Sequence, residues 1–122
     1  MATENALKSI PYTASVDLSD AQYTFVAVSG EDAVGLPVDN GGNAIGIVQN
    51  NPSVGCAAAV AVTGQSKILF GAALSAGAKV TCDATGKAVA VVAGDTILGT
   101  VVQGGGVGII GAIVLSNEGV SA

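Results

Sequence analysis

The 122-residue sequence contains no histidine, no arginine and no tryptophan. Histidine is the commonest general base and metal ligand near neutral pH, so any catalysis would depend on Asp, Glu, Lys, Tyr or Cys. The four basic side chains, all lysines, stand against nine acidic ones, and the net charge is −5. Phosphate backbones are bound by clustered Lys and Arg, which this chain lacks. We therefore expect neither an enzyme nor a nucleic-acid-binding protein.

Aromatic residues are also scarce, although half of the residues are apolar. Tyr12, Tyr23, Phe25 and Phe70 are the full set, so the interior must be built from Val, Ile, Leu and Ala. The length fits one domain. Small side chains bury little area per residue, which makes an isolated monomer marginal and favours burial between subunits.

Cysteines and acidic pairs give no metal or redox signature. Cys56 and Cys82 have no C-x-x-C partner, so we expect two small buried residues, with a cross-strand disulfide as the alternative. Glu31-Asp32, and Asp17 with Asp20, lack the spacing of a calcium-binding loop and are expected to be solvated turn residues. No metal and no cofactor is predicted.

The first 20 residues are polar, lack an apolar period and include Pro11. They predict an extended N-terminal arm at residues 1–20, followed by a β domain at residues 21–122. Ile10, Pro11 and Tyr12 form the main apolar group of this arm. The segment has one lysine and no apolar core of the kind found in a signal peptide, which predicts a protein that stays in the cytosol or leaves it inside a larger assembly.

Beyond residue 20, short apolar runs alternate with turn signals, as is typical of an all-β domain. The run QYTFVAV at 22–28 predicts a strand with Tyr23, Phe25 and Ala27 on one face. Further strands are expected at 33–38, 44–49, 56–63, 66–70, 78–83 and 88–92. The DNGGN turn predicts a hairpin of the strands at 33–38 and 44–49, a TGQ turn separates 56–63 from 66–70, and an ATGK turn joins 78–83 to 88–92.

The other segments are expected to connect these strands. Residues 50–55 should form a loop, because Pro52 has no N–H to donate to a ladder. Residues 71–78 should form a turn or a single helical turn. In the strand at 78–83, Val80 and Cys82 should face inward, and Lys79, Thr81 and Asp83 outward. The sequence IGIVQ at 45–49 resembles LGTVVQ at 98–103, which suggests two similar halves of one barrel.

The stretch GDTILGTVVQGGGVGIIGAIVL at 94–115 allows three interpretations. Its G-x-G-x-x-G is not a dinucleotide motif, because the chain ends too soon for the following helix, second strand and acidic residue. A membrane span is disfavoured by three consecutive glycines and by the lack of basic and aromatic anchors. The third interpretation is two antiparallel strands, 96–102 and 107–115, split at QGGG, whose apolar faces serve as core and interface.

Several motifs occur in an order that resembles the capsid cement, or head decoration, proteins of tailed bacteriophages. They are DLSDAQYTFVAVS, IGIVQNNPSVGCAAAVAVTGQSKI, GAALSAGAKVTCDATGKAV and GDTILGTVV, and they cover most of residues 17–115. Each is mostly turn chemistry, so the shared order carries the resemblance.

This resemblance implies an all-β virion protein, on the outside of a capsid assembled in the host cytoplasm. The fold expected is a small single-domain antiparallel β-barrel or β-sandwich of about eight short strands with the N-terminal arm. The partners implied are the major capsid protein and other copies of the chain, with a homotrimer favoured, and neither nucleic acid nor a membrane. Our candidate capsid-contact residues are Ile10, Pro11, Tyr12, Asn50, Asn51 and Pro52. The alternative function is a virion-displayed β module that binds a host surface or a glycan, for which Tyr12 and Tyr23 are the available aromatic platforms.

Overall fold

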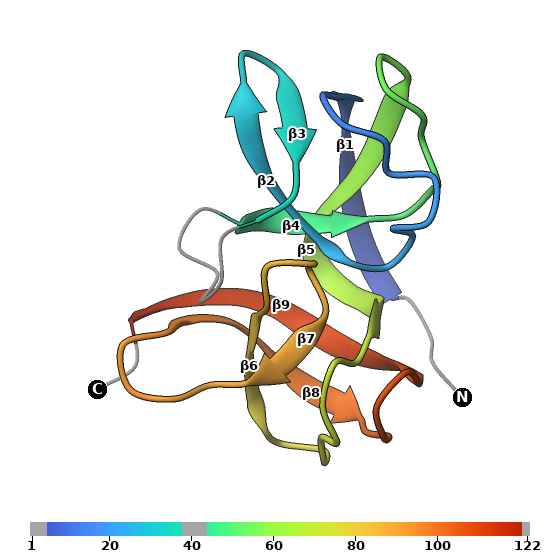
Figure 1. The fold of residues 1–122 in the computed structure, drawn as a ribbon. Helices are drawn as coiled ribbons and strands as arrows, with labels where there is room; N and C mark the ends of the chain where they lie inside the picture. The colour runs from blue at the N-terminus through green and yellow to red at the C-terminus, as the bar shows by residue number, and fades with distance from the viewer. Residues whose placement is uncertain (1–4, 38–43, 121–122) are drawn as a thin grey trace.

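The computed structural model describes residues 5–37 and 44–120, and these form an all-β chain without a helix (Figure 1). This confirms the predicted fold class. The strands are β1 (Asn5–Ala14), β2 (Phe25–Gly30), β3 (Ala33–Gly35), β4 (Ala44–Val48), β5 (Ala57–Leu69), β6 (Lys79–Cys82), β7 (Ala88–Ala90), β8 (Thr96–Gln103) and β9 (Ile110–Val120).

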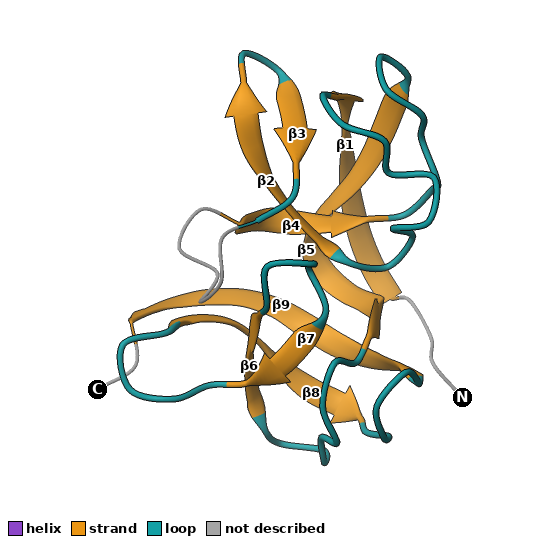
Figure 2. Cartoon of the chain, viewed as in Figure 1, coloured by secondary structure: helices purple, strands orange, loops and turns teal. Residues whose placement is uncertain are grey.

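The sheet order is β1-β3-β2-β4-β5-β9-β8-β6-β7, with an additional pairing of β1 to β5. That pairing closes β1, β3, β2, β4 and the start of β5 into a barrel, which we call the first barrel. The remaining strands continue from β5 as β9, β8, β6 and β7, and form the second half of the molecule (Figure 2). Phe70, just after β5, forms a parallel bridge with Ala88 of β7. The second half therefore also curls back on itself.

Strand β5 is the element that the two halves share. Its beginning pairs with β1 and β4, and Gly64–Leu69 pairs with β9. The predicted TGQ turn within this segment is wrong, because the strand runs through it without a break. Gly64 has a φ of 96°, which a glycine adopts at little cost, and this permits a local change of direction while the pairing continues.

The predicted hairpin of residues 33–38 and 44–49 is also wrong. Strand β2 lies between β3 and β4 and pairs antiparallel with both. The hairpin is instead β2–β3, turning at Glu31-Asp32, where Asp32 has a φ of 52°. Most of the DNGGN turn lies outside the described residues. The hairpin of β6 and β7, the antiparallel pair of β8 and β9, and the loop over 50–55 are confirmed.

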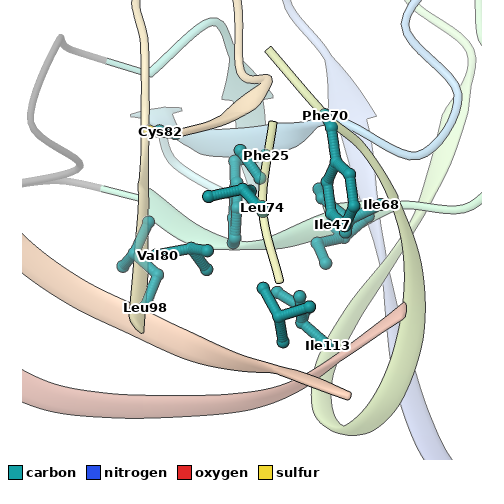
Figure 3. Packing of buried hydrophobic residues seen from close by; sticks show 11 residues of the cluster. Phe25, Ile47, Ile68, Phe70, Leu74, Val80, Cys82, Leu98 and Ile113 are labelled. Carbon is teal, nitrogen blue, oxygen red and sulfur yellow. The ribbon is translucent and has the colours of Figure 1, made fainter. Parts of the chain in front are cut away.

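Within the described residues, the buried apolar side chains form two clusters, one for each half. The first barrel encloses Ala14, Leu18, Val26, Val34, Val48, Ala58 and Val60. The larger cluster contains Phe70 and the apolar residues of the second half, joined by Phe25 and Ile47 from the first barrel (Figure 3). Phe25 and Val26 are adjacent and belong to different clusters, so β2 is buried on both faces. The predicted strand at 22–28 is thus present with Phe25 and Val26 on opposite faces, but it begins at Phe25, and Tyr23 precedes it with a φ of 65°.

The segment expected to form an arm is a barrel strand over Asn5–Ala14. It is extended, as predicted, but it pairs along β5, with Ile10 opposite Val60 and Tyr12 opposite Ala58. Ala14 is in the core of the first barrel and Tyr12 packs against that core. The alternation of Ile10, Tyr12 and Ala14 was the sequence signal for this strand, and Pro11 obscured it.

The predictions for residues 71–78, for strand β6 and for the two cysteines are confirmed only in part. Residues 71–78 form a loop in which Leu74 bridges Gly105. Thr81, expected outward, is buried because β6 is covered on both faces, whereas Lys79 is exposed as predicted. Cys82 is buried as expected, but Cys56 is exposed because it lies in the turn before β5. The two cysteines are not joined in a disulfide.

Candidate interaction surfaces

The predicted contact residues Ile10, Pro11 and Tyr12 lie on the middle of β1 but do not share one face. Pro11 is exposed, and Ile10 and Tyr12 are half-buried. Because side chains alternate along a strand, Ile10 and Tyr12 point to the barrel side and Pro11 points away from it. Pro11 is thus the member of this group that a partner reaches most directly.

The predicted contact residues Asn50, Asn51 and Pro52 lie in the β4–β5 loop and are bonded within the chain. The Asn50 side chain donates to Ala57 O at 3.0 Å and accepts from Ala59 N at 3.1 Å. Pro52 is buried, and its carbonyl accepts from Leu18 N at 2.9 Å. The amide of Asn50 therefore replaces hydrogen bonds that the loop cannot form as a strand.

The structure brings these two groups against the same part of β5. Pro11 is the register partner of Ala59, whose N–H donates to Asn50. Nearby, Ala14 N donates to Cys56 O and Gly55 N donates to Ala14 O. The end of β1 and the β4–β5 loop therefore form one continuous edge of the first barrel.

Three of the motifs that carry the family resemblance contact one another. Gln22, from the opening motif, donates its backbone N–H to Asn51 Oδ1 at 2.9 Å and its side-chain amide to Gln49 O at 2.9 Å. In the β6–β7 turn, which belongs to the DATGK motif, the carbonyl oxygen of Gly86 accepts a hydrogen bond from Phe25 N at 2.8 Å. The bonds of Gln22 tie the opening motif to the β4–β5 loop, and the bond of Phe25 N to Gly86 O joins the two halves, roles that sequence order alone did not reveal.

The DATGK turn is itself fixed by one carboxylate. Asp83 Oδ1 accepts from Thr85 N, Thr85 Oγ1 and Lys87 N at 2.9, 2.7 and 3.0 Å. Asp83 is half-buried, and the residues it binds are local. This carboxylate is a turn-forming group. Among the residues that the structure describes, no group of three or more His, Cys, Asp or Glu could hold a metal ion.

A distinct surface lies where the β8–β9 turn meets the loop after β5. Leu74 and Gly105 exchange backbone hydrogen bonds at 2.9 Å, and Gly108 N donates to Phe70 O at 2.9 Å. Together, residues 71–78 and 104–110 form what we call the uncharged end, because neither segment contains an ionisable side chain. Val107, Ile109 and Ile110 of this end are 72%, 52% and 45% exposed.

Along the outer side of β8 and β9, exposed apolar side chains alternate with polar neighbours, since Thr100 and Gln65 are the register partners of Val114. Val102 and Val114 are 39% and 40% exposed, whereas Val101 and Ile113, on the opposite face, are buried. The two antiparallel strands predicted at 96–102 and 107–115 are therefore confirmed as β8 and β9, although β9 begins at Ile110, and one face of the pair lies in the core. No helix among the described residues has the length and hydropathy of a membrane-spanning segment.

Two cavities lie at the junction of the halves. One, of about 220 Å³, is lined by apolar residues that include Phe25, Ile45, Val62, Leu98 and Leu115. The sequence echo of 45–49 and 98–103 falls here, since Ile45 and Leu98 both line this cavity. The other, of about 250 Å³, is an open groove with Leu36 and Leu69 beside Asp17, Asp20 and Lys87.

The two tyrosines considered for glycan binding lie in different settings. Tyr12 packs against the core of the first barrel. The Tyr23 ring has the Lys67 ammonium 5.6 Å from its centroid. One face of the Tyr23 ring is therefore used by a cation–π contact within the chain.

Comparison with known proteins identifies the fold but no family. No protein-family model matches the chain, and no curated protein matches it. Among solved structures, the chain is similar to the N base of the head fiber protein gp8.5 of bacteriophage phi29, with a TM-score of 0.69 and 17% sequence identity. The match covers 95% of this chain and 99% of the other. The two chains share their fold over almost their whole lengths.

Proposed function

We propose that this protein is a structural component of a bacteriophage virion that binds the outer surface of an assembled head and stabilises it. The observation that carries the proposal is the fold shared, over nearly the whole of both chains, with the base of a phage head fiber. The ordered motifs that resemble cement proteins point to the same class, and in the structure they support one another through hydrogen bonds.

The proposed mechanism is linkage between binding and shell stability. A protein that binds the assembled shell and not the free subunits stabilises the shell by mass action, by about 2.7 kcal/mol per site when its free concentration is about 100 times Kd. A head offers many equivalent sites, and a homo-oligomer binds several of them with an avidity above that of one contact. We include the homo-oligomer, a trimer by the family resemblance, in this proposal.

The chemistry of the surface supports a role in contact. The β8–β9 turn and the start of β9 carry the exposed apolar side chains Val107, Ile109 and Ile110, and exposed apolar surface of this kind usually marks an interaction site. The capsid-contact surface that we favour is the edge of the first barrel formed by Pro11 and the β4–β5 loop, which lies away from this apolar region (Figure 1).

The test is to mix the purified protein with undecorated heads of the phage that encodes it. We expect saturable co-sedimentation and a rise in the melting temperature of the heads. Replacing exposed Pro11 with Glu should weaken binding, while the same change at exposed Val92 serves as a control. A lack of co-sedimentation, together with an unchanged melting temperature, would reject the proposal.

A further inference from the structure

We propose that the uncharged end, residues 71–78 and 104–110, is the surface through which copies of this chain bind one another. This inference rests on the proposed function, which includes a homo-oligomer, and it names the interface of that oligomer. The surface consists of two segments far apart in sequence that the Leu74–Gly105 bridge holds side by side. The fold itself therefore creates this surface.

The uncharged end exposes large apolar side chains. Val107 is the most exposed of the large apolar side chains in the described residues, and the exposed Ile109 and Ile110 follow it after Gly108. All three are β-branched side chains. Such side chains lose little conformational freedom on burial because their χ1 angles are already restricted.

The distribution of charge favours a second copy of the chain as the partner of the uncharged end. The chain carries a net charge of −5, so most approaches of two copies bring like charges together. The acidic turn of Glu31 and Asp32 lies at the opposite end of the molecule from the β8–β9 turn (Figure 1). Contact through the uncharged end therefore keeps these carboxylates apart and places identical apolar surfaces together.

Gly106 gives an independent observation. Its φ is not in the left-handed region, and a Cβ built on it would meet no atom of the chain within 4 Å. Nothing within the chain therefore requires a glycine here, although glycine lowers stability relative to alanine. Close approach of a backbone from another molecule would require one.

The geometry and size of the surface indicate how copies meet. Strands β8 and β9 each have sheet partners on both sides, so association proceeds through side chains and does not extend the sheet. Exposed apolar patches on soluble proteins typically cover about 300–600 Å², less than the ~800 Å² per partner of a standard interface. Convergence of the uncharged ends on a rotation axis, where each copy meets two neighbours, supplies more contact than a single pair.

The experiment is sedimentation velocity of the purified chain over a range of concentrations, without heads. Val107→Asp places a charge on the proposed interface and should weaken association by at least about tenfold, because an unpaired carboxylate would be buried. Val54→Asp is the matched control, since Val54 is 62% exposed and lies in the β4–β5 loop. Gly106→Val should weaken association without lowering the stability of the monomer.

The outcomes are separable from those of the proposed function. Association of the wild-type chain and of Val54→Asp, with loss in Val107→Asp at unchanged circular dichroism, supports the inference. A wild-type chain that stays monomeric overturns it, as does association that Val107→Asp leaves unchanged. If the wild-type chain is monomeric and Val107→Asp abolishes head binding, the uncharged end is a head-binding surface. In that case the inference fails and the proposed function stands.

Discussion

Substitution of Gly86 by alanine tests whether the β6–β7 turn holds the two halves together. Gly86 has a φ of 88°, and its carbonyl accepts Phe25 N at 2.8 Å. A Cβ at this position would overlap Phe25 O and would lie 3.0 Å from the Thr24 Cβ. Thr24 and Phe25 are buried, so neither has room to retreat.

The expected magnitude follows from three contributions. A left-handed backbone costs a residue with a Cβ about 1–2 kcal/mol. Overpacking against buried atoms costs about 1–3 kcal/mol, and loss of the hydrogen bond to Phe25 about 0.5–1.5 kcal/mol. We therefore expect Gly86→Ala to lower the free energy of unfolding by roughly 3–6 kcal/mol, a large share of the ~5–15 kcal/mol typical of a domain.

Gly94→Ala is the matched control. Gly94 has a similar φ of 93°, but a Cβ there would meet nothing within 4 Å. Gly94→Ala should therefore lower the free energy of unfolding only by the conformational contribution of about 1–2 kcal/mol. The measurement is urea unfolding of both variants and the wild type, extrapolated linearly to zero denaturant. Equal losses in the two variants would refute the packing argument, because the backbone conformation alone would then explain both.

Three further predictions concern the first barrel, the core and the thiols. Asn50→Ala should lower the free energy of unfolding by about 1–3 kcal/mol in urea titrations, because it removes the hydrogen bonds to Ala57 and Ala59; an unchanged midpoint would show that water replaces both bonds. Phe70→Ala should cost about 3–5 kcal/mol in the same assay, since Phe70 is fully buried, and a loss below 1 kcal/mol would contradict the assigned core. Cys56 should react with a thiol reagent in the folded protein and Cys82 only after unfolding, so rapid reaction of two thiols in the native state would argue against this structure.

The sequence predicted the fold class and many of the strands because turn chemistry and apolar runs are local signals. It predicted the antiparallel pair of β8 and β9 from the GGG interruption, and the β6–β7 hairpin from ATGK. The same local signals failed at Gly64, where a glycine inside a TGQ segment bends a continuous strand. They also failed at 33–49, because the insertion of β2 between β3 and β4 depends on long-range pairing.

The contact residues show a similar limit. The capsid contact of Asn50 and Pro52 stays a prediction, and sequence did not reveal that these residues also complete the β4–β5 loop, because an asparagine with either role looks alike in sequence. The internal bonds of Asn50 and the burial of Pro52 appear only once the loop is folded against β1 and β5. The sequence shows that residues 96–117 carry no charge. That residues 104–110 lie beside residues 71–78 was known only from the Leu74–Gly105 bridge.

The most direct test of the proposed role is electron cryomicroscopy of undecorated heads after incubation with saturating amounts of this protein. We expect added density at repeated, symmetry-related positions on the outer surface of the shell, with the edge of the first barrel toward the capsid and the uncharged ends of neighbouring copies in contact. Heads that gain no ordered density on the outer surface at saturating concentration would contradict the proposed role.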